Sequence, residues 1–251
     1  MTKGTSDRAE DRQDRGSRFL LVVDSDANNL FYTSMLLQRF EYNICTAKTA
    51  EEALEMAAVA VPALVITDLA PLGMSGLELI RVLRLEPQTA AVPVIVKAGT
   101  WTPEIDLQCW KAGAAACIHK PVRAEELFRA VQAAIESTPR SNIRIPAKLP
   151  VVFPDGAGNS HNGVCTAELS EQGLYVSTLT PLPVKARLPI QLDVKGRRIL
   201  ADAEVIYTYQ FGENPSGDPG MGLAFVRLEP RDREHIRAFI KEEITRGIKS
   251  I

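Results

Sequence analysis

The stretch Phe19-Leu20-Leu21-Val22-Val23-Asp24 is a short apolar run that ends at a carboxylate, and four further runs of similar length follow it. We expect the five runs to be β-strands: Phe19–Val23, Asn43–Ala47, Ala63–Thr67, Val92–Lys97 and Ala115–His119. Amphipathic segments that predict helices lie between and after them: Asn28–Phe40, Ala50–Ala58, Leu77–Leu85, Pro103–Ala112 and Ala124–Ile135. Strands that alternate with helices form βα units and a parallel sheet. The first half of the chain is therefore predicted to be a doubly wound α/β domain with a five-stranded parallel sheet.

The pattern changes after Ser137-Thr138-Pro139, because the residue before a proline is disfavoured in a helix. Beyond this point six short segments with strand character follow one another: Leu149–Phe153, Gly163–Leu169, Leu174–Thr178, Leu188–Val194, Ile199–Tyr209 and Met221–Arg227. A last amphipathic segment, Arg231–Gly247, predicts a helix. Six short strands and a terminal helix indicate a small antiparallel β-barrel with a C-terminal helix.

These patterns divide the chain into four expected segments. Residues 1–17 are polar and rich in both signs of charge, so we expect a disordered tail there rather than a signal peptide. An α/β domain is expected over residues 18–137, a linker over 138–145 and the barrel domain over 146–251. Two domains of this size are common for a chain of 251 residues.

The composition excludes several classes of protein. No apolar run approaches the roughly 20 residues that cross a bilayer, so we expect no membrane insertion. The four cysteines form no CxxC pair, which favours reduced thiols in a cytoplasmic protein. Residues 1–139 carry 14 Lys+Arg against 18 Asp+Glu, and residues 140–251 carry 15 against 13. Neither half is basic enough to predict DNA binding.

Charged residues follow three of the strands expected in the first half. Asp24 and Asp26 come directly after the first strand, Asp68 ends the third, and Lys120-Pro121 follows the fifth. The carboxyl ends of parallel strands meet at one edge of the sheet, where ligands of such folds bind. Clustered carboxylates can hold Mg²⁺ or present a nucleophilic oxygen to a phosphoryl group. A nearby lysine would pair with the phosphate.

Four elements of the first half resemble the response-regulator receiver family: Leu21-Val22-Val23-Asp24, Thr67-Asp68, Gly76 and His119-Lys120-Pro121. The resemblance implies a flavodoxin-like fold and transfer of a phosphoryl group from a sensor histidine kinase to Asp68. It assigns Lys120 to the phosphate, and it implies that Lys120-Pro121 is a cis peptide bond. It also implies a Mg²⁺ site with the residues Asp24, Asp26, Asp68 and Ala70.

Three positions depart from the receiver pattern. Ser25 stands where the family has a second acidic residue, so we expect a weakened Mg²⁺ site. Ala98 replaces the hydroxyl residue at the end of the fourth strand, and Cys117 replaces the aromatic residue of the fifth. Two hypotheses therefore stay open, a receiver that is switched by phosphorylation and a receiver retained for docking or dimerisation.

The segment Arg140-Ser141-Asn142-Ile143-Arg144 places two arginines four residues apart, directly after the first domain. A guanidinium group can stack on a purine and can offer its planar fork to guanine O6 and N7 or to a phosphate. A second element, Glu168-Leu169-Ser170-Glu171-Gln172-Gly173, follows the second strand of the barrel. Its spacing places residues 168 and 170 on one side of a strand end, and Gly173 offers a turn with positive φ.

These two elements resemble the RxxxR and [D/N]xSxxG motifs of the PilZ family, and Gly220–Phe225 resembles its closing strand. The resemblance implies that cyclic di-GMP is bound by Arg140, Arg144, Glu168, Ser170 and Gly173. Glu168 stands where the family has Asp or Asn, and its extra methylene predicts weaker binding rather than none.

The function predicted from these features is a non-enzymatic signal integrator. It would take a phosphoryl input on the first domain and a cyclic di-GMP input on the second. Its output would be contacts with an unidentified downstream protein, with motility or surface polysaccharide as candidate processes. The alternative is a degenerate adaptor that has lost one or both ligand sites and serves as an interaction or homodimerisation module. No set of nucleophile, base and orienting residue predicts a further enzyme activity.

Overall fold

The computed structural model describes residues 18–70, 73–100, 102–136, 142–154, 160–211, 213 and 218–248, with side chains left out at 160–163. The tail predicted over residues 1–17 lies outside this part of the chain. Contacts divide the chain into two compact units, and the second begins at Asn142. Within the described residues, no helix is both long enough and apolar enough to cross a membrane.

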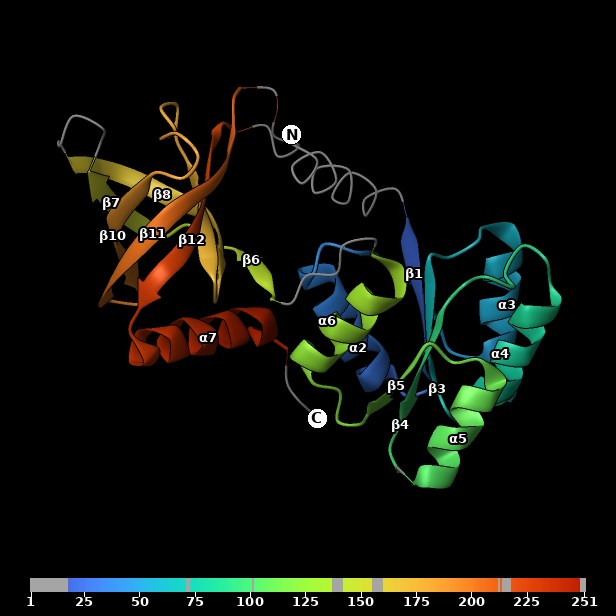
Figure 1. The fold of residues 1–251 in the computed structure, drawn as a ribbon. Helices are drawn as coiled ribbons and strands as arrows, with labels where there is room; N and C mark the ends of the chain where they lie inside the picture. Colours follow the sequence, from blue (N-terminus) through green and yellow to red (C-terminus); the bar gives the residue numbers. More distant parts are fainter. Residues whose placement is uncertain are drawn as a thin grey trace. The chain divides into compact units, whose positions relative to one another are not determined.

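The first unit is a five-stranded parallel sheet in the order β2-β1-β3-β4-β5. Its strands are β1 (Phe19–Val23), β2 (Asn43–Ala47), β3 (Leu64–Asp68), β4 (Val94–Ala98) and β5 (Ala116–His119). Its helices are α2 (Ala27–Arg39), α3 (Ala50–Val59), α4 (Gly76–Leu85), α5 (Pro103–Ala112) and α6 (Ala124–Ile135). Helices α2 and α6 cover one face of the sheet, and α3, α4 and α5 cover the other (Figure 1). The doubly wound fold predicted from the sequence is confirmed.

The central strands of this sheet are buried on both faces, which is why they consist of nearly continuous apolar residues. Leu20, Leu64 and Ile95 are fully buried, one each on β1, β3 and β4. The strand order brings the ends of β1, β3, β4 and β5 next to one another at one edge of the sheet. In the ladder between β3 and β4, Asp68 lies opposite Lys97. This edge positions the first candidate site.

The second unit is an antiparallel barrel of six strands, as predicted. The strands are β7 (Pro150–Pro154), β8 (Ser160–Ser170), β9 (Gly173–Ser177), β10 (Arg187–Val194), β11 (Arg197–Tyr209) and β12 (Gly220–Leu228). They pair in the order β8-β7-β10-β11-β12-β9, and β9 pairs again with β8 to close the barrel. Helix α7 (Pro230–Thr245) follows the last strand.

A seventh strand, β6 (Arg144–Pro146), lies outside the six-stranded circuit and pairs with β8. The linker predicted over residues 138–145 runs into this strand, in which Arg144 has a defined register against β8. Strand β8 can accept this partner since β7 pairs with its N-terminal part, from Ser160 to Cys165. Its C-terminal part pairs with β9 along one edge and with β6 along the other.

Helix α7 attaches to the barrel through one apolar face. Its buried residues recur at helical spacing and are Ile236, Phe239, Ile240 and Ile244. Burial of such side chains stabilises the unit by about 1.5–3 kcal/mol each. Arg233 donates a hydrogen bond to the carbonyl oxygen of Glu171 at 2.7 Å, and Arg237 pairs with the Glu171 carboxylate at 2.8 Å. The helix therefore contacts the turn between β8 and β9, which belongs to the second candidate site.

Candidate functional sites

At the edge of the parallel sheet, two carboxylates and two lysines form a chain of ion pairs. Lys97 Nζ lies 2.8 Å from Asp24 Oδ2. Lys120 Nζ lies 3.3 Å from the same oxygen and 3.0 Å from Asp68 Oδ2. The structure therefore brings together Asp24, Asp68 and Lys120, as the sequence predicted. It adds Lys97, to which the sequence pattern assigned no role beyond the end of a strand.

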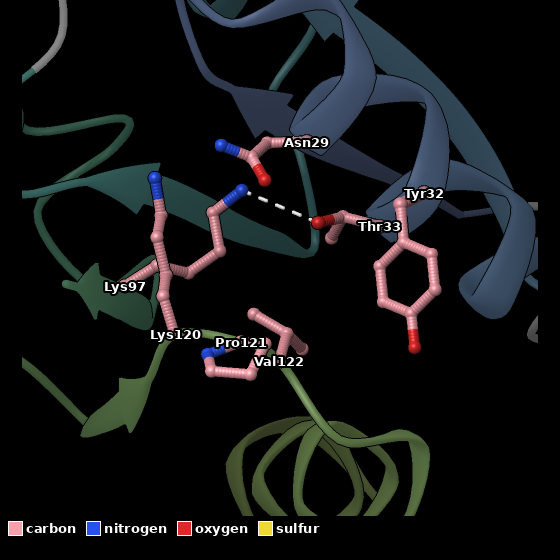
Figure 2. Close-up of a pocket in the computed structure, with 7 residues that line it drawn as sticks. All are labelled: Asn29, Tyr32, Thr33, Lys97, Lys120, Pro121 and Val122. Atoms are coloured by element: carbon pink, nitrogen blue, oxygen red, sulfur yellow. Dashed lines mark hydrogen bonds between the residues drawn. The ribbon is translucent and has the colours of Figure 1, made fainter. Parts of the chain in front are cut away.

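The Lys97 side chain is fully buried, as is that of Asp24. Its neighbours on β4, Val96 and Ala98, are also buried, so the ammonium group reaches its partners from inside the core. Besides the pair with Asp24, Lys97 Nζ donates a hydrogen bond to Thr33 Oγ1 on α2 at 3.3 Å (Figure 2). The sequence contained one signal for this role, since Lys97 lies within the apolar run Val94–Ala98. A lysine is almost never buried unless it is paired, so its position in a buried strand indicates a buried partner.

Burial alone would raise the pKa of the Asp24 carboxyl, but the Lys97 ammonium and the smaller effect of Lys120 hold it below its usual value. For Lys97, burial is the largest influence and lowers its pKa, against the opposing attraction of Asp24. The asymmetry has a simple cause, since one carboxylate faces two ammonium groups. Asp24 thus pairs with both lysines of the cluster.

Asp68 and Lys120 are the accessible members of the cluster. Their side chains are 17% and 20% exposed, in contrast to the buried pair behind them. Asp68 Oδ1 accepts a hydrogen bond from the backbone N–H of Leu69 at 2.9 Å, while Oδ2 pairs with Lys120. An incoming phosphoryl group could reach Asp68 from solvent and would find the Lys120 ammonium beside it. This is the arrangement expected of an acceptor carboxylate and its phosphate partner.

The predicted Mg²⁺ ligands are occupied by other contacts. Asp26 is the N-cap of α2, and its Oδ1 accepts hydrogen bonds from the backbone N–H groups of Asn28 and Asn29, both at 2.9 Å. Asp24 Oδ1 accepts from the backbone N–H of Asp26 at 3.0 Å, and Asp24 Oδ2 is held by two lysines. Ala70 is exposed and has only a backbone carbonyl to offer.

Within the described part of the chain, no three His, Cys, Asp or Glu residues are grouped so that they could hold a metal ion. Mg²⁺ requires near-octahedral oxygen ligands, one or two of which are usually carboxylates. Since lysines and backbone N–H groups engage these carboxylates, the arrangement of Asp24, Asp26, Asp68 and Ala70 does not fit the Mg²⁺ site that the sequence resemblance implied.

A pocket opens beside the lysines, between α2 and the loop that follows β5. It is lined by Asn29, Tyr32, Thr33, Lys97, Lys120, Pro121 and Val122 (Figure 2). The Lys120-Pro121 peptide bond is cis, as the resemblance implied. Burial, and to a smaller extent the charge of Glu125, raises the pKa of Tyr32, so its hydroxyl stays neutral in the pocket wall.

The two positions that depart from the receiver pattern on β4 and β5 lie against the core. Ala98 is buried and offers no hydroxyl at the end of β4. Cys117 on β5 packs partly buried against the apolar core of the sheet. Burial, together with the neighbouring Cys109, raises the pKa of Cys117 to about 12, so it stays a neutral thiol. Neither position supplies the hydroxyl or the aromatic group of the receiver pattern.

The second candidate site lies where β6 pairs with β8. In this ladder Arg144 is opposite Ser170, and Pro146 is opposite Glu168. The Arg144 guanidinium Nη1 lies 3.9 Å from Glu168 Oε2, and the two side chains are 29% and 15% exposed. The structure thus brings together parts of both sequence elements, although 24 residues separate Arg144 from Glu168 along the chain. Arg140 lies outside the described residues.

Ser170 and Gly173 shape the turn beneath this site. Ser170 Oγ donates a hydrogen bond to the carbonyl oxygen of Gly173 at 3.0 Å and accepts one from the N–H of Gln172 at 3.4 Å. The expectation that Gly173 has a positive φ is wrong, since it is absent from the glycines with that conformation. A Cβ atom at Gly173 would lie 2.0 Å from the carbonyl oxygen of Leu223. Gly173 is therefore required by the close approach of β12.

Comparison with known families finds a domain model for each of the two units. A family model for the response regulator receiver domain matches residues 20–132, and one for the PilZ domain matches residues 138–242. Each covers less than half of the chain, and together they account for most of it.

Two relatives illustrate the match to the receiver domain, and each of them covers less than half of this chain. Sensory/regulatory protein RpfC of Xanthomonas campestris pv. campestris is 33% identical over 116 residues, which are 45% of this chain and 16% of that protein. Protein PilH of Pseudomonas aeruginosa is 25% identical over 118 residues, or 46% of this chain and 96% of PilH. A solved structure of Vibrio cholerae chemotaxis protein CheY4 is 26% identical, covers 47% of this chain and 98% of CheY4, and has a TM-score of 0.45.

The matches to the two family models follow one another along the chain without overlap, and each coincides with one of the two folds. The chain therefore contains a response regulator receiver domain followed by a PilZ domain.

Proposed function

We propose that this response regulator binds cyclic di-GMP at the junction of β6 and β8, through Arg140, Arg144, Glu168, Ser170 and Gly173. The observation that carries the proposal is the ladder register that sets Arg144 opposite Ser170. It brings residues of both PilZ sequence elements to one place on the barrel. A guanidinium, a carboxylate and a hydroxyl at one strand junction are suited to a ligand that has both guanine edges and phosphates.

Each side chain has a distinct chemical task in this proposal. The Arg144 guanidinium would offer its planar fork to guanine O6 and N7 or to a phosphate. The Glu168 carboxylate would accept hydrogen bonds from the guanine amino group. The 3.9 Å separation between Arg144 Nη1 and Glu168 Oε2 is longer than a direct hydrogen bond. Gly173 would keep the turn close to β12, which holds Ser170 in place.

The receiver domain would supply the input. In this proposal Asp68 accepts a phosphoryl group from a sensor histidine kinase, and Lys120 pairs with the phosphate that forms. The accessibility of these two side chains and the 3.0 Å distance between Lys120 Nζ and Asp68 Oδ2 support it. Both domains are regulatory modules, so the output would be contacts with a downstream protein in the cytoplasm. Motility and surface polysaccharide production are the processes we propose for that output.

A second candidate function is a degenerate adaptor, in which the receiver domain serves for docking or dimerisation. The buried Lys97–Asp24 pair and the absence of a hydroxyl at Ala98 favour it for the receiver domain. An adaptor that has lost the PilZ site as well predicts no binding of cyclic di-GMP. The two functions therefore differ in what they predict for ligand binding.

Calorimetric titration of the full chain with cyclic di-GMP distinguishes the two functions, with cyclic di-AMP as a control for base recognition. We expect saturable heat with cyclic di-GMP and none with cyclic di-AMP, because the adenine edge offers an amino group where guanine offers O6. Absence of heat with cyclic di-GMP at high concentration would reject the receptor function and leave the adaptor.

A further inference from the structure

The buried ion pair between Lys97 and Asp24 is a feature that neither a phosphoryl input nor cyclic di-GMP binding explains. Both side chains have no exposed surface, and the Nζ to Oδ2 distance of 2.8 Å is that of a strong charge-assisted hydrogen bond. Burial of a charge is costly unless the charge is paired and hydrogen-bonded. Lys97 meets that condition through Asp24 and Thr33 together.

The charges at this edge of the sheet balance without a metal ion. Asp24 and Asp68 contribute two negative charges, and Lys97 and Lys120 contribute two positive charges within hydrogen-bonding distance of them. The remaining carboxylate, Asp26, is oriented by the N-terminus of α2, which already stabilises a negative charge. No uncompensated cluster of carboxylates remains in this group of described residues to attract a divalent cation.

A divalent cation that bound Asp24 would also have to displace an ammonium group from its partner inside the core. Lys97 lies on β4 between two buried residues, and its ammonium group is held by Asp24 and Thr33. Displaced from Asp24, its charge would stay in the core a few ångströms from the cation, and like charges in a medium of low polarity repel strongly. The two positive charges therefore exclude one another.

We propose that the Lys97 ammonium takes the place of a divalent cation at Asp24, so that the carboxylate site of this receiver domain is complete without metal. The proposal goes beyond the function proposed above and does not depend on cyclic di-GMP binding. It treats Lys97 as a built-in counter-ion, which belongs to the chain and does not depend on the Mg²⁺ concentration of the cell.

The alternative is that Lys97 only stabilises the fold, while metal still binds through Asp68 and the neighbouring backbone. Measurement of metal binding distinguishes the two hypotheses. If Lys97 only stabilises the fold, removal of its charge should leave the affinity for a divalent cation unchanged. Mn²⁺ is a suitable probe because the signal of the free ion in electron paramagnetic resonance falls when it binds, and calorimetry with Mg²⁺ provides a second measurement.

The experiment titrates the full chain and two variants with Mn²⁺. Lys97→Met removes the charge and keeps most of the side-chain volume, and Lys111→Met removes an exposed lysine on α5 as the matched control. We expect no saturable binding below millimolar Mn²⁺ in the wild type and the control, and at least about tenfold tighter binding in Lys97→Met. Sub-millimolar binding by the wild type would overturn the proposal, as would a folded Lys97→Met variant that binds no better.

A further variant decides the matter if Lys97→Met fails to fold. Ser25→Asp adds a carboxylate next to Asp24 while Lys97 stays in place. If Lys97 excludes the cation, this variant should bind Mn²⁺ no more tightly than the wild type. If instead the missing carboxylate alone limits binding, Ser25→Asp will bind Mn²⁺ at sub-millimolar concentrations, and the proposal is rejected.

Discussion

Arg144 and Ser170 face one another across the ladder between β6 and β8, in a strand pairing that spans only three residues. The pairing gives Arg144 a fixed backbone position on the barrel, although the chain reaches it directly from the segment between the domains. Glu168 lies two residues before Ser170 and points its carboxylate to within 3.9 Å of the Arg144 guanidinium. Ligand affinity should therefore respond to each of these side chains separately.

Replacement of Arg144 should weaken cyclic di-GMP binding. A hydrogen bond to a charged group contributes about 1.5–3 kcal/mol, so Arg144→Ala should lower affinity by at least about tenfold. Calorimetry measures the affinity. Arg187→Ala is the matched control, since Arg187 pairs with Glu204 at 2.7 Å on another part of the barrel. Equal affinity for the wild type and Arg144→Ala would contradict the proposed site.

Shortening Glu168 should have the opposite effect. Glu168→Asp keeps the carboxylate but removes one methylene, and with it one rotatable bond that is fixed on binding. We expect tighter binding of cyclic di-GMP by a factor of about two to ten. Glu204→Asp serves as the control for the same change elsewhere on the barrel. Weaker binding by Glu168→Asp would show that the longer side chain is needed to reach the ligand.

Asp68→Asn should abolish phosphorylation of the receiver domain. The amide is a poor nucleophile, while the fold should tolerate it because the Asp68 side chain is partly exposed. Electrophoresis in a phosphate-binding gel, after incubation with acetyl phosphate or a cognate kinase, should show a shifted band for the wild type and for the control Asp106→Asn. A shifted band that persists in Asp68→Asn would place the acceptor elsewhere.

The stability of the receiver domain should fall in acid because of Asp24. The pKa of Asp24 is lower in the folded chain than in the unfolded chain. Its pairing therefore stabilises the fold above the unfolded pKa of about 4, and that stabilisation is lost as the pH falls through the folded pKa. Asp24→Asn should lose about 3–5 kcal/mol at neutral pH, because Lys97 is left buried without its partner.

Urea unfolding at a series of pH values measures this effect. Both tryptophans of the chain, Trp101 and Trp110, lie within the sequence matched by the receiver model, so tryptophan fluorescence reports the receiver domain without interference from the barrel. We expect a smaller dependence on pH below about pH 4 for Asp24→Asn than for the wild type. Parallel curves for the two proteins would show that other carboxylates cause the acid sensitivity.

Cys117 should react slowly with thiol reagents. Only the thiolate is nucleophilic, and a pKa raised to about 12 leaves almost none of it near neutral pH. Cys165 on β8 is exposed and should be modified first. Alkylation with iodoacetamide followed by peptide mass spectrometry gives the rate at each cysteine, and Cys165→Ser should remove the fast phase. Modification of Cys117 as fast as Cys165 would contradict its burial in the core of the sheet.

The sequence by itself predicted both folds, because each depends on a local period. The strands β1 and β2 and the helices α5 and α6 have the predicted bounds. Alternation of strands with helices required a parallel sheet, and six alternating strands required a barrel. In a parallel sheet the carboxyl ends of the strands lie at one edge. Asp24, Asp68 and Lys120 all follow or end such strands, so their meeting could be predicted without the structure.

The tertiary structure alone decided how these groups are connected. Lys97 meets Asp24 across 73 positions of sequence, and nothing local to β4 indicates that its ammonium ends beside Thr33. Likewise, β6 is too short to show strand character and exists because β8 offers it an open edge. A glycine is needed at position 173 because a side chain there would collide with the Leu223 carbonyl oxygen of β12, and not because the turn requires a positive φ. Local periodicity determines which side of a strand a residue occupies, but the partner of a buried charge is determined by the elements that pack against it.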